Sequence, residues 1–277
     1  MQFFDSHAHY DDRRFSNEYP GGVDALLQFI FTEGVTRVCN VGSSLRSSME
    51  SLAMADYYNG RPGYPLFCAS VGLHPCDALE VPEIMTADIL DELRSLSAHP
   101  KAVAIGEIGL DYHWDEDHHD RQKEMFDLQL SLAEEVKKPV IIHDRDAHGD
   151  TFDILAAHPK VTGVLHSYSG SPEMARQLAD KGWYISFSGP VTYKNAAKVK
   201  DACAIVPEDL LLLETDAPYL PPVPHRGKMN HSGYLVHTAA VMAEIRGTTQ
   251  EAIAETTYRN ACRFFSLHCS GLSSASL

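Results

Sequence analysis

Two histidines near the start of the chain, His7 and His9, are separated by one residue and follow the apolar pair Phe3-Phe4. In a β-strand the side chains alternate between faces, so both imidazoles would point to the same side. Neutral imidazole is the commonest protein ligand of transition metals, and two on one face supply half of a tetrahedral site. The pair alone is equally compatible with an ordinary polar strand end. Other ligand-type residues in the chain are needed to favour a metal site.

Further side chains of the types that bind metals follow other short apolar runs. They are Glu107, His143, His166 and Asp216, with His74 after a fifth run. A single acid or histidine at such a place can simply be a strand end that meets water. Four histidines and two acids, all placed after apolar runs, indicate one shared site instead.

The apolar runs alternate with amphipathic segments along the whole chain. Strands are expected at 2–5, 37–41, 66–71, 102–107, 140–143, 163–166, 184–187 and 210–214, and helices at 22–33, 44–57, 86–97, 120–136, 149–157, 172–180, 194–204 and 234–245. Eight strands that alternate with eight helices predict an α/β fold of the (β/α)8 TIM-barrel type, as does a length of 277 residues. An open doubly wound sheet fits the same alternation, but no Gly-x-Gly-x-x-Gly motif follows the first strand.

The ends of the chain complete the predicted domain. Extra helices at 250–255 and 259–267 are expected to close the bottom or the side of the barrel, and residues 270–277 to form a frayed tail. With no internal repeat and no linker, we expect residues 1–277 to form one domain.

In a barrel, the active site lies at the carboxyl ends of the strands, where all six ligand-type residues would meet. Strands 1 and 8 become neighbours when the barrel closes, strands 5 and 6 are adjacent, and a carboxylate can bridge two ions with its two oxygens. The predicted two-metal centre has His7, His9 and Asp216 around one ion, His143 and His166 around the second, and Glu107 between them. These ligands suit zinc best, with manganese, magnesium, cobalt, iron or nickel as alternatives.

Such a centre predicts hydrolysis. Two ions can activate a shared water and stabilise charge on the substrate oxygens. Asp216 would then act as the general base as well as a ligand, and the bridging Glu107 is the second predicted catalytic residue. Arg145 is a predicted phosphate clamp, because a guanidinium binds oxyanions bidentately. The other predicted substrate-binding residues are His74, His225 and Arg226.

Four segments resemble the TatD-type deoxyribonuclease family of the metal-dependent amidohydrolase superfamily. They begin at Phe3 (FFDSHAH), Gly106 (GEIGLDY), Pro139 (PVIIHDR) and Glu214 (ETDAPY), and a PHRGK segment follows as it does in the family. The resemblance covers the chain from Phe3 to about Phe265. It implies a (β/α)8 barrel, hydrolysis of phosphodiester bonds, typically in DNA, and the same six metal ligands.

Two loops depart from the family pattern. After His166 the chain reads Ser167-Tyr168, where relatives more often have a small residue and phenylalanine, and residues 230–234 read NHSGY, where relatives usually have an acid or amide and then proline. Neither departure removes a ligand. The second changes a loop that is expected to face the substrate, so the preferred substrate stays open.

Composition limits the partners. With 23 Lys and Arg against 38 Asp and Glu, the net charge of −15 argues against a broad basic surface that wraps nucleic acid. We therefore expect short or single-stranded DNA as the substrate, and no membrane or obligatory protein partner. The six scattered cysteines, the lack of a signal peptide and the lack of a long apolar run predict a cytoplasmic protein.

Two other functions fit the same residues. An amidase, lactonase or other esterase would use the same metal centre to attack carbon instead of phosphorus, because fold and metal site alone do not define the substrate. A metal-binding scaffold without turnover is the third possibility, and the complete ligand set with Asp216 argues against it.

Overall fold

The structure is a computed structural model that describes residues 1–115 and 117–269. Its sheet has eight parallel strands that are hydrogen-bonded in sequence order. They are β1 (Phe3–Ala8), β2 (Val35–Val41), β3 (Leu66–Val71), β4 (Ala102–Asp111), β5 (Val140–Arg145), β6 (Gly163–Leu165), β7 (Tyr184–Phe187) and β8 (Leu211–Leu213). A parallel bridge between Ala8 and Ala217 joins β1 to the segment after β8, so the sheet closes almost completely. The predicted TIM barrel is confirmed.

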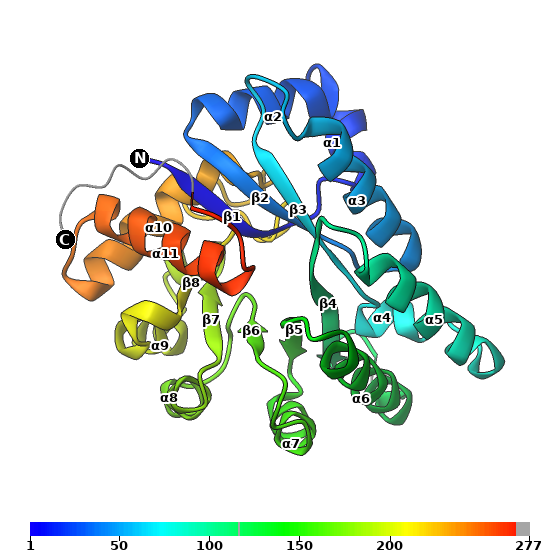
Figure 1. Ribbon diagram of the computed structural model, residues 1–277. Helices are drawn as coiled ribbons and strands as arrows, with labels where there is room; N and C mark the ends of the chain where they lie inside the picture. The colour runs from blue at the N-terminus through cyan, green and yellow to red at the C-terminus, as the bar shows by residue number, and fades with distance from the viewer. Residues whose placement is uncertain (116, 270–277) are drawn as a thin grey trace.

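Helices surround the strands (Figure 1). The α-helices are α1 (Arg13–Glu18), α2 (Gly22–Thr32), α3 (Leu45–Tyr58), α4 (Pro75–Ala78), α5 (Thr86–Ser97), α6 (His119–Val136), α7 (His148–Ala157), α8 (Pro172–Asp180), α9 (Ala197–Ile205), α10 (Leu235–Arg246) and α11 (Gln250–Phe264). Short 3-10 turns are η1 (Glu83–Met85), η2 (Gly189–Thr192), η3 (Glu208–Leu210) and η4 (Ser232–Tyr234). Among the described residues, no helix is both long and apolar enough to cross a bilayer.

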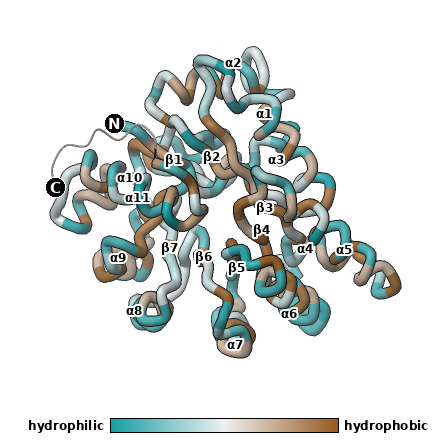
Figure 2. Tube along the Cα trace, in the orientation of Figure 1, coloured by the Kyte–Doolittle hydropathy of each residue, from teal (hydrophilic) through white to brown (hydrophobic). Residues whose placement is uncertain are grey.

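Local signals in the sequence explain where several helices begin. The Ser44 hydroxyl accepts a hydrogen bond from the Ser47 amide at the start of α3, and Thr249 does the same for the Ala252 amide in α11. The alternation of apolar and polar segments along the helices is visible in Figure 2, where β3 and β4 are the most apolar part of the centre.

One cluster of buried residues fills the lower half of the barrel, at the amino ends of the strands. It takes residues from every strand except β7, whose Tyr184 packs against it, and adds Tyr258, Cys262 and Phe265 from α11 and its end. The Phe4 ring lies 5.9 Å from the Tyr258 ring and 5.7 Å from the Phe265 ring. The C-terminal helix therefore closes the bottom of the barrel, as predicted; we call this cluster the barrel floor.

The structure corrects several predicted boundaries. The two helices expected at 250–255 and 259–267 are the single helix α11 (Gln250–Phe264), which runs without a break through residues 256–258. Strands β1, β4 and β5 run two to four residues beyond their predicted ends, and β6 and β8 are shorter than predicted. The short helices α1 and α4 were not predicted. The tail expected at 270–277 lies outside the described residues.

Candidate metal centre

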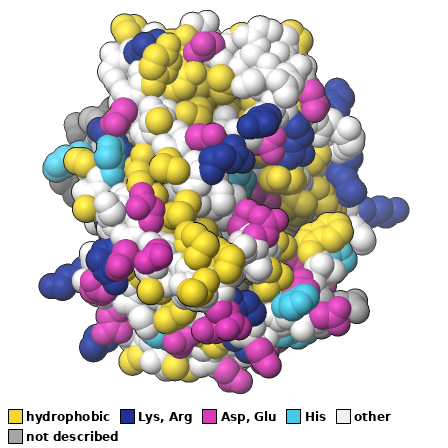
Figure 3. Space-filling model, turned by 90° about the vertical axis from the view of Figure 1, so that its right-hand side faces the viewer, with side chains coloured by type: hydrophobic (Ala, Val, Ile, Leu, Met, Phe, Trp, Pro, Cys, Tyr) yellow, Lys and Arg dark blue, Asp and Glu magenta, His cyan; other side chains and the backbone are white. Residues whose placement is uncertain are grey.

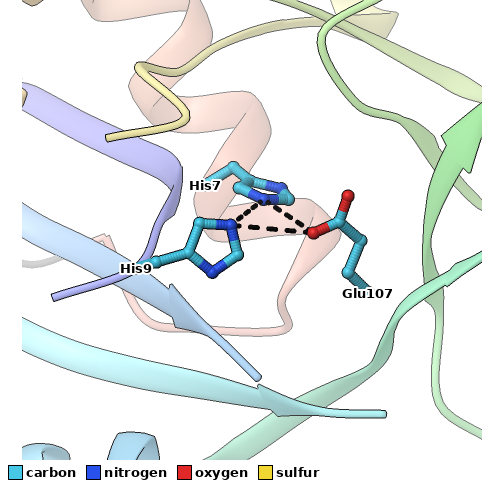
Figure 4. A group of neighbouring side chains, drawn as sticks. All are labelled: His7, His9 and Glu107. Atoms are coloured by element: carbon cyan, nitrogen blue, oxygen red, sulfur yellow. Dashed lines mark hydrogen bonds and ion pairs between the residues drawn. The ribbon is translucent and has the colours of Figure 1, made fainter. Parts of the chain in front are cut away.

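His7 and His9 lie on the same side of the chain at the carboxyl end of β1, as their spacing predicts. Their Nε2 atoms are 3.0 Å apart, and both rings are buried. The Nδ1 atom of His9 lies 2.8 Å from the carbonyl oxygen of Val41 at the end of β2, which fixes the ring and turns Nε2 towards the barrel axis. Figure 4 shows both rings pointing towards Glu107, which comes from β4.

Glu107 separates two groups of histidines. Its Oε2 atom lies 3.5 Å from His7 Nε2 and 3.6 Å from His9 Nε2. Its Oε1 atom lies 2.8 Å from both His143 Nδ1 and His166 Nε2. Each oxygen therefore faces one histidine pair, which is the arrangement expected of a bridging carboxylate.

Asp216 completes the group around His7 and His9. Its Oδ1 atom lies 3.6 Å from His7 Nε2 and 3.5 Å from His9 Nε2. The Asp216 amide donates to the His7 carbonyl at 2.9 Å, and its backbone has a left-handed φ of 60°, which aspartate tolerates better than most residues. This turn after β8 brings the carboxylate next to β1.

Two acids outside the predicted set hold the second histidine pair in place. Asp111 Oδ2 lies 2.9 Å from His143 Nε2, and Glu214 Oε1 lies 3.2 Å from His166 Nδ1. Carboxylates that bind the far nitrogen of a metal-binding histidine orient its ring and raise its basicity. Gly109 also lets β4 lie close to β5 at this point, because a Cβ atom on residue 109 would lie 2.0 Å from the His143 carbonyl oxygen.

The electrostatics of the cluster favour a positive charge at its centre. Burial alone would raise the pKa of Glu107, but the charges of His166 and His7 hold that pKa well below its usual value. Burial would lower the pKa of His9, but the hydrogen bond with Asp216 and the charge of Glu107 raise it to about 9. The pKa of Asp216 is lowered despite burial, through the hydrogen bond with His9 and the charge of His166. The lowered pKa values of Glu107 and Asp216 both favour ionised carboxylates, which need compensating positive charge beside them.

These residues fit a bound metal. His7, His9 and Glu107 offer ligand atoms that lie within 4.8 Å of one another, and so do His74, Glu107 and His143. A divalent cation supplies the same compensating charge as the histidine protons and takes nitrogen and carboxylate oxygen together. The chemistry of the donor set and the way its atoms converge therefore both suit a transition metal.

A cavity of about 810 Å³ lies above the cluster at the carboxyl ends of the strands. Arg145 and His74 line it, together with all six predicted ligands except His7. The His74 ring caps α4, since its Nδ1 accepts a hydrogen bond from the Cys76 amide at 3.2 Å, and its Nε2 lies 4.0 Å from Glu107 Oε1.

The structure does not bring His225 and Arg226 to the wall of this cavity. His225 stacks on Tyr234 and places its Nε2 atom 2.9 Å from that of His237, and the Arg226 guanidinium lies 4.0 Å from the centre of the Tyr193 ring. Both side chains therefore contact residues that do not line the cavity. The proline-rich sequence indicated a loop near the mouth, but not the direction in which its side chains point.

Comparisons with known proteins agree with this geometry. Residues 4–266 match the family described as TatD related DNase. The chain belongs to this family. It is 40% identical to the metal-dependent hydrolase YabD of Bacillus subtilis, over 96% of this chain and 99% of YabD, and 38% identical to the metal-dependent hydrolase YcfH of Escherichia coli K12, over 99% of both chains. Both of these relatives are described as uncharacterized. The crystal structure of YjjV, a TatD homolog from Escherichia coli K12, has a TM-score of 0.84 and 31% identity, over 96% of this chain and 98% of that one.

The resemblance seen in the sequence is therefore confirmed, and the chain is a member of a family of metal-dependent hydrolases. The loop at 230–234, which departs from the usual TatD pattern, forms hydrogen bonds both to the segment after β8 and to β1. Asn230 donates to the carbonyl oxygens of Thr215 and Tyr219, and the Ser232 hydroxyl donates to Asp5 at 2.6 Å. Burial raises the pKa of Asp5 to about 7, although its hydrogen bonds with Ser232 and Thr215 lower that pKa. This loop supports the turn that carries Asp216.

Sequence reasoning missed four residues of the site. Asp111, Glu214 and Tyr219 stand in the quoted motifs, and the positions of the two acids, at the end of β4 and directly after β8, could have marked them as neighbours of the ligands. Trp114 and Tyr219 line the cavity with exposed aromatic rings. No motif distinguishes an aromatic residue in a loop from one in the core, so only the structure identifies these two.

Proposed function

We propose that this TatD-family protein hydrolyses phosphodiester bonds, with DNA as its substrate, and that two divalent metal ions bind at the barrel mouth. The observation that carries the proposal is the position of Glu107, whose two oxygens face two separate histidine pairs. His7, His9 and Asp216 would hold one ion, and His143 and His166 the other, with Glu107 shared. Zinc fits these ligands best, and manganese, magnesium, cobalt, iron or nickel are alternatives. When bound, two such ions lower the pKa of water and offset charge on phosphate oxygens.

The protein's own side chains supply the remaining steps. Asp216 lines the cavity as an ionised carboxylate, so its Oδ atoms can accept the proton of the attacking water. Arg145 is exposed at the cavity wall and can bind a non-bridging phosphate oxygen through two N–H groups. Asp111 and Glu214 hold the rings of His143 and His166 in position.

Charge supports a short or single-stranded substrate. On the face shown in Figure 3, basic, acidic and apolar side chains are interspersed, with no continuous basic surface. A duplex footprint depends on many phosphate contacts and the counterions that they release. A protein with a net charge of −15 offers few such phosphate contacts outside the cavity. We also propose that the protein works in the cytoplasm, where its six free cysteines stay reduced.

The test is cleavage of a short single-stranded DNA by metal-stripped protein that has been reloaded with zinc, manganese or magnesium. We expect activity to return with metal and to be lost in Asp216→Asn, assayed at a metal concentration that keeps both sites of the folded variant occupied. A metal-loaded wild-type protein that cleaves no DNA would overturn the proposal. Turnover of a carboxylic ester, lactone or amide would then favour the amidohydrolase alternative, and inactivity on all of these substrates a metal-binding scaffold.

A further inference from the structure

Two large aromatic rings stand exposed at the cavity, at positions that the metal centre does not explain. Trp114 has 69% of its surface exposed and Tyr219 has 48%, and both line the cavity. Pockets that bind small ligands are typically lined by hydrophobic and aromatic side chains, so two exposed rings at the wall of one cavity are candidate ligand contacts. The mechanism proposed above uses neither residue.

The two rings lie on opposite sides of the barrel. Trp114 follows β4 and stands beside Arg145 at the end of β5, whereas Tyr219 follows β8 and stands near the loop after β1. In a closed barrel of eight strands in sequence order, β4 and β5 lie opposite β8 and β1. The proposed ligands come from β1, β4 and β5 and from the turns after β6 and β8, so their cluster lies between the two rings.

Each ring is held in position by its neighbours. Asp111 Oδ1 accepts hydrogen bonds from the amides of His113 and Trp114, both at 3.0 Å, which fixes the turn after β4. The Arg14 guanidinium lies 4.4 Å from the centre of the Tyr219 ring and is itself bound to Asp12 at 3.0 and 2.7 Å. Arg14 is therefore paired with Asp12 and packs on the Tyr219 ring.

Two arginines that line the cavity have no acidic partner in the described part of the chain, and one of them lies beside the Trp114 ring. The basic residues that line the cavity are Arg13, Arg46 and Arg145. Arg46 forms an ion pair with Glu50 at 3.0 Å, whereas Arg13 and Arg145 form none with any acid in the described part of the chain. The Arg145 guanidinium lies 5.4 Å from the centre of the Trp114 ring. Arg13 directly precedes Arg14, which packs on Tyr219.

We propose that these two corners, Trp114 with Arg145 and Tyr219 with Arg13, bind the two nucleotides on either side of the phosphodiester that is cleaved. Each ring stacks on one base, and each arginine contacts the backbone. This inference rests on the proposed function and deepens it, because the smallest complete substrate becomes a dinucleotide with both bases unpaired. Bases inside a duplex have no free face for such rings, whereas single-stranded bases stack readily on aromatic side chains.

The test uses thymidylyl-thymidine, which has a single phosphodiester, and three analogues in which an abasic sugar replaces the 5′ nucleoside, the 3′ nucleoside or both. kcat/KM is measured for wild type, Trp114→Ala, Tyr219→Ala and the double variant, all loaded with the same metal. Trp114→Phe and Tyr219→Phe keep an aromatic face and serve as matched controls. Arg46→Gln is the control for Arg145→Gln, because Arg46 is already paired.

We expect each alanine variant to lower kcat/KM on the dinucleotide by about 5- to 150-fold, the usual range for loss of one stacked base. One variant should lose its effect when the 5′ base is missing and the other when the 3′ base is missing, and all four proteins should be equal on the doubly abasic diester. Arg145→Gln should lower kcat/KM on all four diesters, and Arg46→Gln should not.

Unchanged kinetics in the alanine variants, or equal losses on all four substrates, would overturn this inference while leaving the phosphodiesterase proposal intact. Cleavage of longer strands without cleavage of the dinucleotide would also overturn it. A wild type that cleaves no diester at all would instead overturn the proposed function, and this inference with it.

Discussion

The two ends of the barrel are built on opposite principles. The floor consists of packed apolar side chains from the strands and α11, whereas the mouth buries His7, His9, Glu107, His166 and Asp111 close together. Burial of apolar surface stabilises the fold, but burial of ionisable groups is costly unless they are paired or bind a cation. The barrel floor should therefore determine the stability of the protein, and the mouth should determine its activity. Substitutions in the floor should leave activity largely unchanged, and substitutions in the mouth should leave stability largely unchanged.

Glu107→Gln should show the largest loss of activity without a matching loss of stability. The change keeps the size of the side chain but removes the charge that both histidine pairs share. We expect kcat/KM to fall by about 10⁴-fold or more, ~5.5 kcal/mol of transition-state stabilisation, with the protein still folded. Steady-state kinetics and circular dichroism check this, and retained activity in a folded Glu107→Gln protein would refute the role given to this residue.

Phe4→Ala should show the reverse pattern at the floor. Phe4 is buried against Tyr258 and Phe265, and truncation of a buried phenylalanine costs about 3–5 kcal/mol of unfolding free energy. Chemical denaturation measures the loss, and kcat per folded molecule should stay close to that of wild type. Phe4→Leu should lose less. A large fall in kcat without a loss of stability would mean that the two ends are coupled.

Asp111→Asn tests the support of the metal centre. Loss of the charge beside His143 Nε2 should lower metal affinity or activity by about 10- to 100-fold without unfolding the protein. Metal titration and kinetics measure the two effects. Asp77→Asn is the matched control, because Asp77 lines the same cavity and makes no hydrogen bond to the six ligands in the described structure. Equal losses in both variants would point to general cavity charge instead of ring orientation.

His231 should make the loop at the mouth sensitive to acid. Burial, together with the charge of His225, lowers the pKa of His231 to about 4, and its ring packs on Phe29 and Tyr234. The folded pKa lies below the unfolded value, so the contribution to stability is complete above about pH 6.5 and is lost as the pH falls towards 4. Wild type should lose about 2 kcal/mol more than His231→Asn between pH 7 and pH 5. Denaturation curves at the two pH values test this, and identical losses would contradict it.

The two regions also differ in how far the sequence predicts them. Hydrophobic alternation locates the eight strands and the closing role of the C-terminal segment, because barrel packing depends mainly on where apolar residues occur. The six ligand-type residues lie close together because the carboxyl ends of parallel strands meet at one side of the barrel. The position of His225 away from the cavity wall, the pairing of Asp111 with His143 and the exposed rings of Trp114 and Tyr219 depend on loop geometry, which the periodicity of the sequence does not predict.

The most direct test of the account is the number and position of the metal ions in the loaded protein. Inductively coupled plasma mass spectrometry should find two ions per chain, and anomalous diffraction from zinc-loaded crystals should place them on opposite sides of the Glu107 carboxylate. Glu107→Gln should lose affinity for both ions, whereas Asp216→Asn should weaken only the ion beside His7 and His9. A single ion, or two ions on the same side of Glu107, would contradict the central claim that this carboxylate divides the mouth into two metal sites.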